Sequence, residues 1–420
     1  MSSSLIITVL GSGVSGLGVA LKAKEVGLKC ILYEARDSGG GLLDNFFVQE
    51  FRFDYSVHLS FAEEKKVREI FDKSKFIKHS SESTCFEQDK WLKHPVQNNL
   101  FPLDLKTKVE LIESFIKRPK TLDDKSYKSW LIHQYGEKIS FRYPLKYTLK
   151  YWNTDPEKLS TNWIGNRMRR AELKEILNGA ISESTPNHYY AKEMRYPSKG
   201  GFKSFIRPLL EIANVRYNHK CTEIDIGKKQ LFFKNKKIEH YEKLVSSLPL
   251  PELIKLIKKC PLPVREAAKR LCATSIDLVS IGFNKIITPK LWFYIYDEDI
   301  FASRAHSPSV KSNDSCPPNT SSLQFETYSR GLKSRYTKKS LIKNCIYALK
   351  KMNLADEKDI LFVDHRRINY GNVIFDLGME DNRKIVRDWL HKNDIITCGR
   401  FGEWDYLWSN QSLMSGYNAI

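Results

Sequence analysis

The stretch LIITVLGSGVSGLGVALKAKEVG, residues 5–27, decides the fold of this chain. Its first six residues are apolar and rich in β-branched side chains, which is typical of a strand buried on both faces. Gly11, Gly13 and Gly16 follow in GxGxxG spacing, and the remainder has the composition of a helix that ends at Gly27. A strand, a glycine-rich turn and a helix in this order predict the first βα unit of a parallel sheet.

A second apolar segment, KCILYEA at residues 29–35, carries Glu34 near its end, 18 residues after Gly16. In such a unit the first glycine permits a tight turn, the second lets a pyrophosphate approach the backbone, and the third allows close strand–helix packing. The helix amino terminus offers free N–H groups to the phosphates. Glu34 can accept hydrogen bonds from a ribose, and its charge would repel a 2′-phosphate. The pattern predicts a dinucleotide site made by Gly11, Gly13, Val14, Ser15, Gly16, Glu34, Ala35 and Arg36.

Three successive glycines, Gly39 to Gly41, come directly after this unit in ARDSGGGLLDN. Bare backbone here indicates that a bulky group packs against it, although the tip of a loop would explain the glycines too. A planar isoalloxazine ring is such a group, so the run favours FAD over NAD as the dinucleotide. Gly40, Gly41 and Leu42 therefore join the predicted cofactor contacts.

The composition is that of an ordinary globular protein of 420 residues, long enough for two or three domains and a large core. Lys and Arg outnumber Asp and Glu by 68 to 49, and the net charge of +19 attracts anions such as nucleic acid, anionic membranes or phosphorylated small molecules. No nucleic-acid-binding motif accompanies this charge, so solvated lysine side chains are the favoured explanation. Residues 2–21 carry no charge, but their glycines and the missing basic start disfavour a signal peptide or a membrane span.

The cysteines and histidines are scattered along the chain. The eight cysteines include no CxxC pair, which predicts reduced thiols and a cytoplasmic location rather than a disulfide framework. None of the ten histidines joins an acidic or cysteine cluster at ligand spacing, so no metal site is predicted. The chemistry is then expected to come from the organic cofactor, which the protein positions.

Five segments in a fixed order carry a resemblance to a known superfamily. They are GSGVSG with Glu34 and SGGG, DYSVHLSFAEEKKVREIF (54–71), YTLKYWNTDPEKLSTNWIGNRMRR (147–170), YPSKGGFKSFIRPLL (196–210) and ITCGRFGEWDYLWSNQSLMSG (396–416). Together they resemble the amine-oxidase and protoporphyrinogen-oxidase-like FAD enzymes. Within this superfamily they are most similar to UDP-galactopyranose mutase and its bacterial relatives from surface-polysaccharide pathways.

The resemblance implies a mixed α/β (α+β) fold, in which a Rossmann-like FAD-binding domain of the GR2 type carries an inserted helical subdomain and an antiparallel β-sheet substrate domain. Helical spacing at 104–136 and strand character at 274–285, 291–299 and 321–329 agree with this. Residues 307–322 are predicted to form an exposed loop. The predicted division assigns 1–85, 196–270 and 361–420 to the FAD-binding domain, 86–195 to the helical subdomain and 271–360 to the sheet domain.

The resemblance also implies roles for individual residues. His58 matches a histidine that lies near the flavin, with a packed core histidine as the alternative reading of the residue. Trp152 and the arginines of NRMRR match a helical-domain stretch whose cations would hold a substrate diphosphate; a core tryptophan and a solvated helix face are the alternatives. Arg400, between two glycines after an apolar strand, is predicted to pair with the FAD pyrophosphate. The predicted catalytic residues are His58, Trp152, Arg170 and Tyr406, and Gln411 joins Arg400 among the predicted cofactor contacts. Tyr406 and Gln411 are expected to line the flavin edge, with simple packing as the alternative for both.

The chain departs from the mutase pattern at three places. Ser56-Val57 stand where the mutase has Gly-Pro before its histidine. Leu323 stands near the position of a substrate-binding arginine, while the glutamate that follows is kept as Glu326. In the carboxy-terminal motif, Trp408 and Asn410 stand where the mutase tends to have acidic residues.

The predicted function is therefore that of an FAD enzyme acting on a nucleotide sugar or a related surface-glycan precursor. The mutase resemblance implies a ring contraction in which reduced flavin is the nucleophile and no net redox change occurs. The alternative is an oxidoreductase that takes hydride from an amine, an alcohol or a ring C–H. An NAD-dependent dehydrogenase and a non-catalytic dinucleotide-binding module are weaker alternatives. The expected partner is a small molecule, a diphosphate-bearing sugar, with no specific nucleic acid, and the mutase relatives imply a homodimer.

Overall fold

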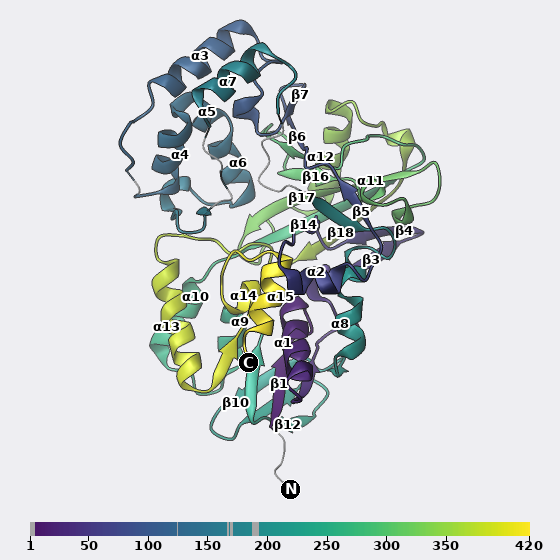
Figure 1. The fold of residues 1–420 in the computed structure, drawn as a ribbon, viewed down its shortest axis with the longest axis vertical. Coiled ribbons are helices and arrows are strands. Elements are labelled where there is room, and N and C mark those ends of the chain that lie inside the picture. Colours follow the sequence, from purple (N-terminus) through teal and green to yellow (C-terminus); the bar gives the residue numbers. More distant parts are fainter. Residues whose placement is uncertain (1–4, 124, 166–167, 169–170, 187–192) are drawn as a thin grey trace.

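The computed structural model describes residues 5–123, 125–165, 168, 171–186 and 193–420. Figure 1 shows an elongated molecule whose lower lobe contains the first strand and the carboxy terminus. In the upper part a helical region and a β-sheet lie side by side. A Rossmann-like lobe with a separate, largely antiparallel sheet confirms the predicted fold class.

The lower lobe is built on a parallel sheet of five strands in the order β19-β13-β1-β2-β9. Side chains of the central strand alternate between the two faces, so Ile7 and Val9 join one core cluster and Leu10 joins another. The apolar run that opens the chain thus forms the strand buried on both faces that the sequence predicts. The strand bounds are β1 Ile6–Leu10, β2 Lys29–Tyr33, β9 Val215–Arg216, β13 Lys243–Ser246 and β19 Ile395–Thr397.

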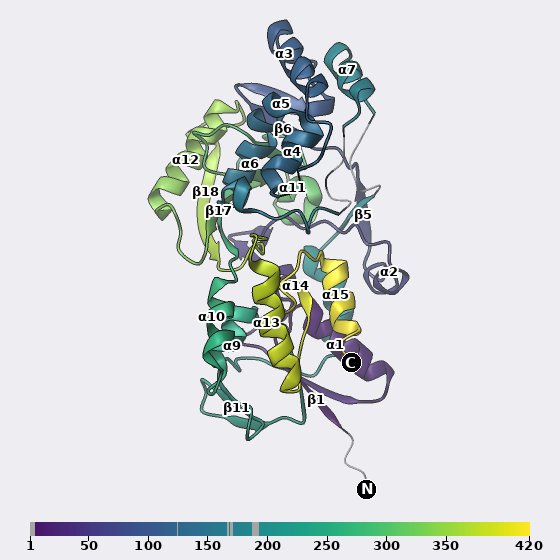
Figure 2. The same cartoon turned by 90° about the vertical axis from the view of Figure 1, so that its left-hand side faces the viewer.

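Helices cover both faces of the parallel sheet (Figures 1 and 2). On one side lie α1 (Val14–Glu25), α8 (Arg207–Ile212) and α15 (Ser409–Tyr417), and on the other α9 (Leu250–Leu256), α10 (Leu262–Arg270) and α13 (Met379–Lys392). The first and last helices approach so closely that a Cβ atom on Gly18 would lie 2.3 Å from the Leu413 carbonyl oxygen. Glycine at this position therefore lets α15 pack against α1.

Two smaller β-structures stand apart from the two large sheets. Strands β10 (Cys221–Asp225), β11 (Gln230–Phe233) and β12 (Ile238–His240) form a separate antiparallel sheet. Strands β3 (Asn45–Val48) and β4 (Phe51–Asp54) form a hairpin after the second glycine-rich loop, and α2 (Lys65–Phe71) follows it. The strands between residues 215 and 246 are therefore divided between the parallel sheet and this antiparallel one.

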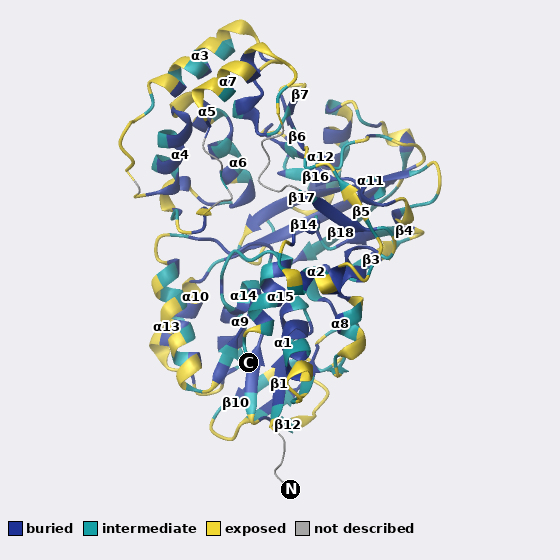
Figure 3. Cartoon of the chain, in the orientation of Figure 1, coloured by how far each residue is buried: buried dark blue, intermediate teal, exposed yellow. Residues whose placement is uncertain are grey.

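The upper sheet has seven strands in the order β18-β14-β17-β16-β15-β6-β7. Its two long central strands pair antiparallel in register over ten residues, and both are buried almost throughout (Figure 3). The three segments predicted as antiparallel strands form β14, β15 and β17, as expected. The bounds are β6 Thr84–Glu87, β7 Lys90–Lys93, β14 Thr274–Phe283, β15 Trp292–Ile295, β16 Arg304–His306, β17 Ser321–Arg330 and β18 Ile360–Ile368, and α12 (Lys338–Lys351) lies against this sheet.

The helical region comprises α3 (Leu105–Ile116), α4 (Tyr127–Tyr135), α5 (Glu137–Arg142), α6 (Pro144–Tyr151) and α7 (Leu173–Ile181). The chain leaves the lower lobe through β5 (Phe76–His79) and returns through β8 (Met194–Pro197), and these two strands pair with each other. Residues 86–93, which the sequence groups with the helices, instead complete β6 and form β7 at the edge of the large sheet. Among the described residues, no helix combines the length and apolar character needed to cross a membrane.

The prediction of an exposed loop at 307–322 is wrong. Residues Pro308–Lys311 form a short helix, α11, and the Lys311 side chain is fully buried. Its ammonium lies 3.4 Å from the carboxylate of Asp54, which is also buried and accepts a hydrogen bond from the Tyr196 hydroxyl at 2.6 Å. The polar composition of the segment suggested solvent exposure, but an internal ion pair accounts for the lysine.

Replacing Lys311 by Met is expected to lower the free energy of unfolding by about 3–5 kcal/mol, because Asp54 would keep a buried charge without its counter-ion. Urea unfolding measures the change, with the exposed Lys234→Met as the control. The double variant Asp54→Asn/Lys311→Met should recover much of the loss, since it removes both charges. Equal stability of Lys311→Met and the control would contradict this account.

Candidate active site

A cavity lies where the carboxyl ends of β1 and β2 meet one face of the seven-stranded sheet. In open α/β sheets this end of the strands is where ligands bind. Of the predicted residues, the cavity is lined by Gly11, Gly13, Val14, Ser15, Glu34, Gly40, Gly41, Leu42, His58, Arg400 and Tyr406. Gly16, Ala35, Arg36, Trp152 and Gln411 are not part of its lining, and Arg170 lies outside the described residues.

The two glycine-rich loops lie against each other at one end of the cavity. The Gly40 N–H donates to the Ser12 carbonyl oxygen at 2.9 Å. A Cβ atom on Gly13 would meet only the Gly41 Cα atom, at 3.9 Å, so this backbone is not crowded by the protein. A Cβ on Gly16 would instead lie 2.1 Å from the Gly11 carbonyl oxygen, which fits a packing role rather than a ligand contact.

Glu34 stands at the carboxyl end of β2 and is nearly buried. One carboxylate oxygen accepts from the backbone N–H and the hydroxyl of Ser12, at 3.0 and 2.9 Å, and the other accepts from the Arg36 N–H at 3.0 Å. These bonds fix the carboxylate beside the first glycine loop. Arg36 donates to the Gly41 carbonyl oxygen at 2.8 Å and so braces the second loop without lining the cavity.

Arg400 lies in the short helix α14 (Gly399–Gly402), directly after β19. Its guanidinium donates to the Leu407 and Gly371 carbonyl oxygens and to the Asn372 side chain, at 2.8, 3.3 and 3.2 Å. Within the described part of the chain, no carboxylate lies within 4 Å of this guanidinium. The positive charge is therefore left uncompensated at the wall of the cavity.

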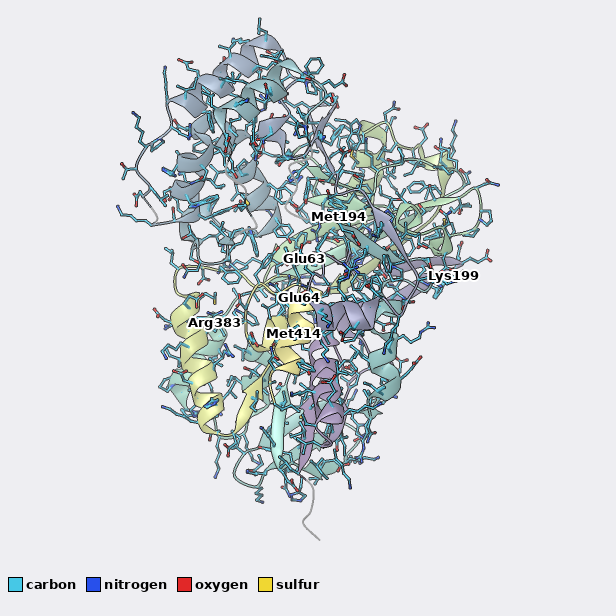
Figure 4. The ribbon with its side chains drawn as sticks, in the orientation of Figure 1. Glu63, Glu64, Met194, Lys199, Arg383 and Met414 are labelled. Atoms are coloured by element: carbon cyan, nitrogen blue, oxygen red, sulfur yellow. The ribbon has the colours of Figure 1, made fainter. Side chains whose placement is uncertain are left out.

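The carboxy-terminal segment lines the cavity next to Arg400. Gln411 uses its side-chain oxygen to accept the Trp408 N–H at 2.9 Å, which caps the start of α15, while Trp408 and Ser412 line the cavity. Asn410 donates to the carboxylate of Glu64 at 2.8 Å, and Figure 4 labels Glu64 beside α15. Gln411, which the sequence predicts at the flavin edge, caps this helix in the structure and is not part of the cavity lining.

His58 lines the cavity and stacks at an angle on Phe202, with ring centroids 5.3 Å apart. Its Nδ1 atom lies 3.1 Å from the Ser56 carbonyl oxygen, which can only accept, so Nδ1 carries the proton and Nε2 is left as an acceptor. Burial lowers the pKa of His58 to about 4. The side chain is therefore neutral near pH 7.

Trp152 is buried in the aromatic core below the cavity. Its ring packs against Tyr151, Trp163 and Tyr406, with centroids 5.1, 5.4 and 5.8 Å apart. Tyr151 and Tyr406 line the cavity and Trp152 does not. This tryptophan therefore reaches the cavity only through the rings that it supports.

Sequence reasoning singled out Glu326 at the far end of the cavity but missed its partners Arg304 and Tyr328. Arg304 on β16 faces Glu326 on β17 and donates through Nε to one carboxylate oxygen at 2.6 Å. The Tyr328 hydroxyl donates to the same oxygen at 2.6 Å and accepts from Arg304 Nη2 at 2.9 Å. Arg304 is thus a cation in the lining of the cavity, whereas Leu323, which stands near the position of the mutase arginine, is buried in the core of the sheet. The short strand RAH, residues 304–306, contains no motif by which Arg304 could be found.

The other oxygen of Glu326 is held by the loop that carries His58. It accepts from the Ser56 hydroxyl at 2.6 Å and from the Val57 N–H at 2.7 Å. Burial alone would raise the pKa of this carboxyl group, but the Arg304 charge and these hydrogen bonds outweigh burial and lower it to about 2. Glu326 is therefore a buried carboxylate with four donors.

Comparisons with known proteins extend this picture. Residues 9–74 match the family model described as an NAD(P)-binding Rossmann-like domain. A crystal structure of reduced UDP-galactopyranose mutase superposes with a TM-score of 0.92 at 23% sequence identity, over 99% of this chain and 94% of that one.

Two further solved structures cover 99% of this chain. A protein from Exiguobacterium sp. 255-15, described as a candidate protoporphyrinogen oxidase, has a TM-score of 0.76 at 15% identity over 97% of its length. Cyclohexylamine oxidase from Brevibacterium oxydans IH-35A has a TM-score of 0.70 at 14% identity over 98% of its length. The chain therefore has the fold that these three structures share, and its residues 9–74 are similar to an NAD(P)-binding Rossmann-like domain.

Proposed function

We propose that this protein is an FAD-dependent enzyme that acts on a nucleotide-diphosphate sugar or a related surface-glycan precursor. The observation that carries the proposal is the continuity of the cavity, which runs from the glycine loops and Glu34, past His58, to Arg304 and its tyrosines. A dinucleotide held at the first end would bring its reactive part toward the second. The likeness to the mutase fold supports the choice of substrate class.

The residues at the first end fit FAD. The open backbone at Gly13 leaves room for a pyrophosphate, and the uncompensated Arg400 supplies a positive charge on the same wall. Glu34, fixed by Ser12, can accept from a ribose hydroxyl. When bound, FAD would supply a ring able either to act as a nucleophile in its reduced form or to accept hydride in its oxidised form.

The residues at the second end suit an anionic, hydroxyl-rich substrate. Arg304 has two of its donor groups engaged by Glu326 and Tyr328, while its Nη1 atom has no partner among the described residues. Tyr151 and Tyr406 offer rings and hydroxyls to a sugar. In this arrangement Arg304 binds a phosphate oxygen and neutral His58 offers an acceptor, Nε2, to a substrate or cofactor hydrogen.

An oxidoreductase acting on an amine, an alcohol or a ring C–H is the second candidate. The shared fold of cyclohexylamine oxidase supports it. Arg304 and Arg400 present hydrogen-bond donors to the cavity, and a protonated amine, which can only donate, cannot accept from them. This is why a phosphorylated substrate is preferred.

Gly13→Val is expected to lower the amount of FAD that co-purifies with the protein to a few per cent, because the side chain would fill the space left for the pyrophosphate. Absorbance in the flavin bands relative to that at 280 nm measures retention. The exposed Gly227→Val serves as the control, since its Cβ would meet nothing closer than 3.6 Å. A normal flavin content in Gly13→Val would refute the placement of the cofactor.

Dithionite-reduced enzyme is expected to interconvert the two ring forms of UDP-galactose, while the oxidised enzyme is not. Arg304→Lys keeps a positive charge beside Glu326 but loses the planar guanidinium, which can bind two oxygen atoms at once. The KM for the nucleotide sugar should therefore rise about tenfold, a change of about 1.4 kcal/mol in binding free energy. Chromatography of the nucleotide sugars measures the exchange, and Arg335→Lys, on the surface, is the control. Oxygen consumption on amines or alcohols without ring exchange would instead support the oxidoreductase.

His58→Ala is expected to shift the redox potential of the bound flavin by the same amount at pH 5.5, 7 and 8. The reason is that a pKa of about 4 keeps His58 neutral throughout this window, so its contribution does not change with protonation. Spectroelectrochemical titration measures the potential, and the exposed His240→Ala is the control. A difference that disappears below pH 6.5 would show that His58 titrates there, and no difference at any pH would return it to a packing role.

A further inference from the structure

Ser56 occupies a backbone conformation that normally belongs to glycine. Its φ angle is +82°, in the left-handed region where a Cβ atom crowds the backbone. A serine in this conformation costs free energy relative to glycine. Its side chain makes a contact that glycine could not provide.

That contact is with Glu326. The buried Ser56 hydroxyl donates to one carboxylate oxygen at 2.6 Å, and the next residue, Val57, donates its N–H to the same oxygen at 2.7 Å. Because the turn at Ser56 has a positive φ, both donors converge on a single acceptor. The carboxylate is then anchored from one side by the loop and from the other by Arg304 and Tyr328.

The same residue also holds His58. The Ser56 carbonyl oxygen accepts from His58 Nδ1, so one residue orients the imidazole through its backbone and the Arg304–Glu326 pair through its side chain. His58 and Arg304 both line the cavity. Ser56 therefore joins the loop next to the proposed cofactor to the cation at the far end.

We infer that Ser56 is a positioning residue that presets Arg304, through Glu326, to bind an anionic group of the substrate. Without the hydroxyl, Glu326 keeps the Val57 N–H but loses the shorter of its two hydrogen bonds to the loop, so its carboxylate and the Arg304 guanidinium are held less firmly. Arg304 would then have to be reordered when the anion binds, and preorganisation would be lost. The inference rests on the proposed function, because it takes a phosphate of the substrate as that anion.

Ser56→Gly separates positioning from folding. Glycine suits a φ of +82° and removes the strain, so the midpoint of thermal unfolding should stay level or rise, whereas a purely structural hydroxyl would give a fall. The affinity for UDP, measured by isothermal titration calorimetry with the flavin-loaded protein, should nevertheless weaken about five- to tenfold. Ser56→Ala, which keeps the strain and loses the hydroxyl, should weaken binding equally and also lower the unfolding midpoint.

Lys236→Gly is the matched control, because Lys236 also has a positive φ, +66°, but is exposed on the surface. It should leave the affinity for UDP unchanged. Equal affinity of Ser56→Gly and the unsubstituted protein would overturn the positioning role alone. No binding of UDP by the unsubstituted protein at millimolar concentration would overturn the proposed substrate class, and this inference with it.

Discussion

The buried carboxylate of Glu326 is the constraint on which the arrangement of the cavity depends. A charge removed from water costs several kcal/mol unless its hydrogen-bonding capacity is met. Here four donors meet it, and they come from the His58 loop on one side and from β16 and β17 on the other. The two lobes are therefore joined by an interaction that tolerates little displacement, and the cavity between them inherits its shape from that interaction.

The two ends of the cavity differ in their electrostatic environment. At the sheet end the positive charge of Arg304 is balanced by Glu326, so recognition there depends on the direction of hydrogen bonds more than on net charge. At the Rossmann end the guanidinium of Arg400 touches carbonyl and amide oxygens but no described carboxylate, so it acts as an unbalanced charge. A ligand with a pyrophosphate at one end and a neutral reactive group further along suits such a gradient.

The sequence predicted best those parts whose structure is encoded locally. The β1–α1 unit follows from an apolar run and the spacing of its glycines, and Glu34 follows from its place at the end of the second apolar segment. All of these features appear in the structure as expected. Arg304 could not be found in this way, because its importance arises from pairing with Glu326 on a neighbouring strand. Lys311 was misjudged for the same reason: a polar segment looks exposed until a distant Asp54 is known to lie opposite it. Long-range partners, rather than local propensities, account for what sequence reasoning lacked.

The order of strands in the parallel sheet has a consequence for how the chain is made. The central β1 ends at Leu10, but its neighbour β13 begins only at Lys243 and the edge strand β19 only at Ile395. At roughly 5–20 residues per second, a growing chain would carry an unpaired, apolar edge of β1 for about 10–50 s before β13 is synthesised. During biosynthesis this edge is a template for wrong pairing, so production of the protein should depend on chaperones that shield a nascent strand.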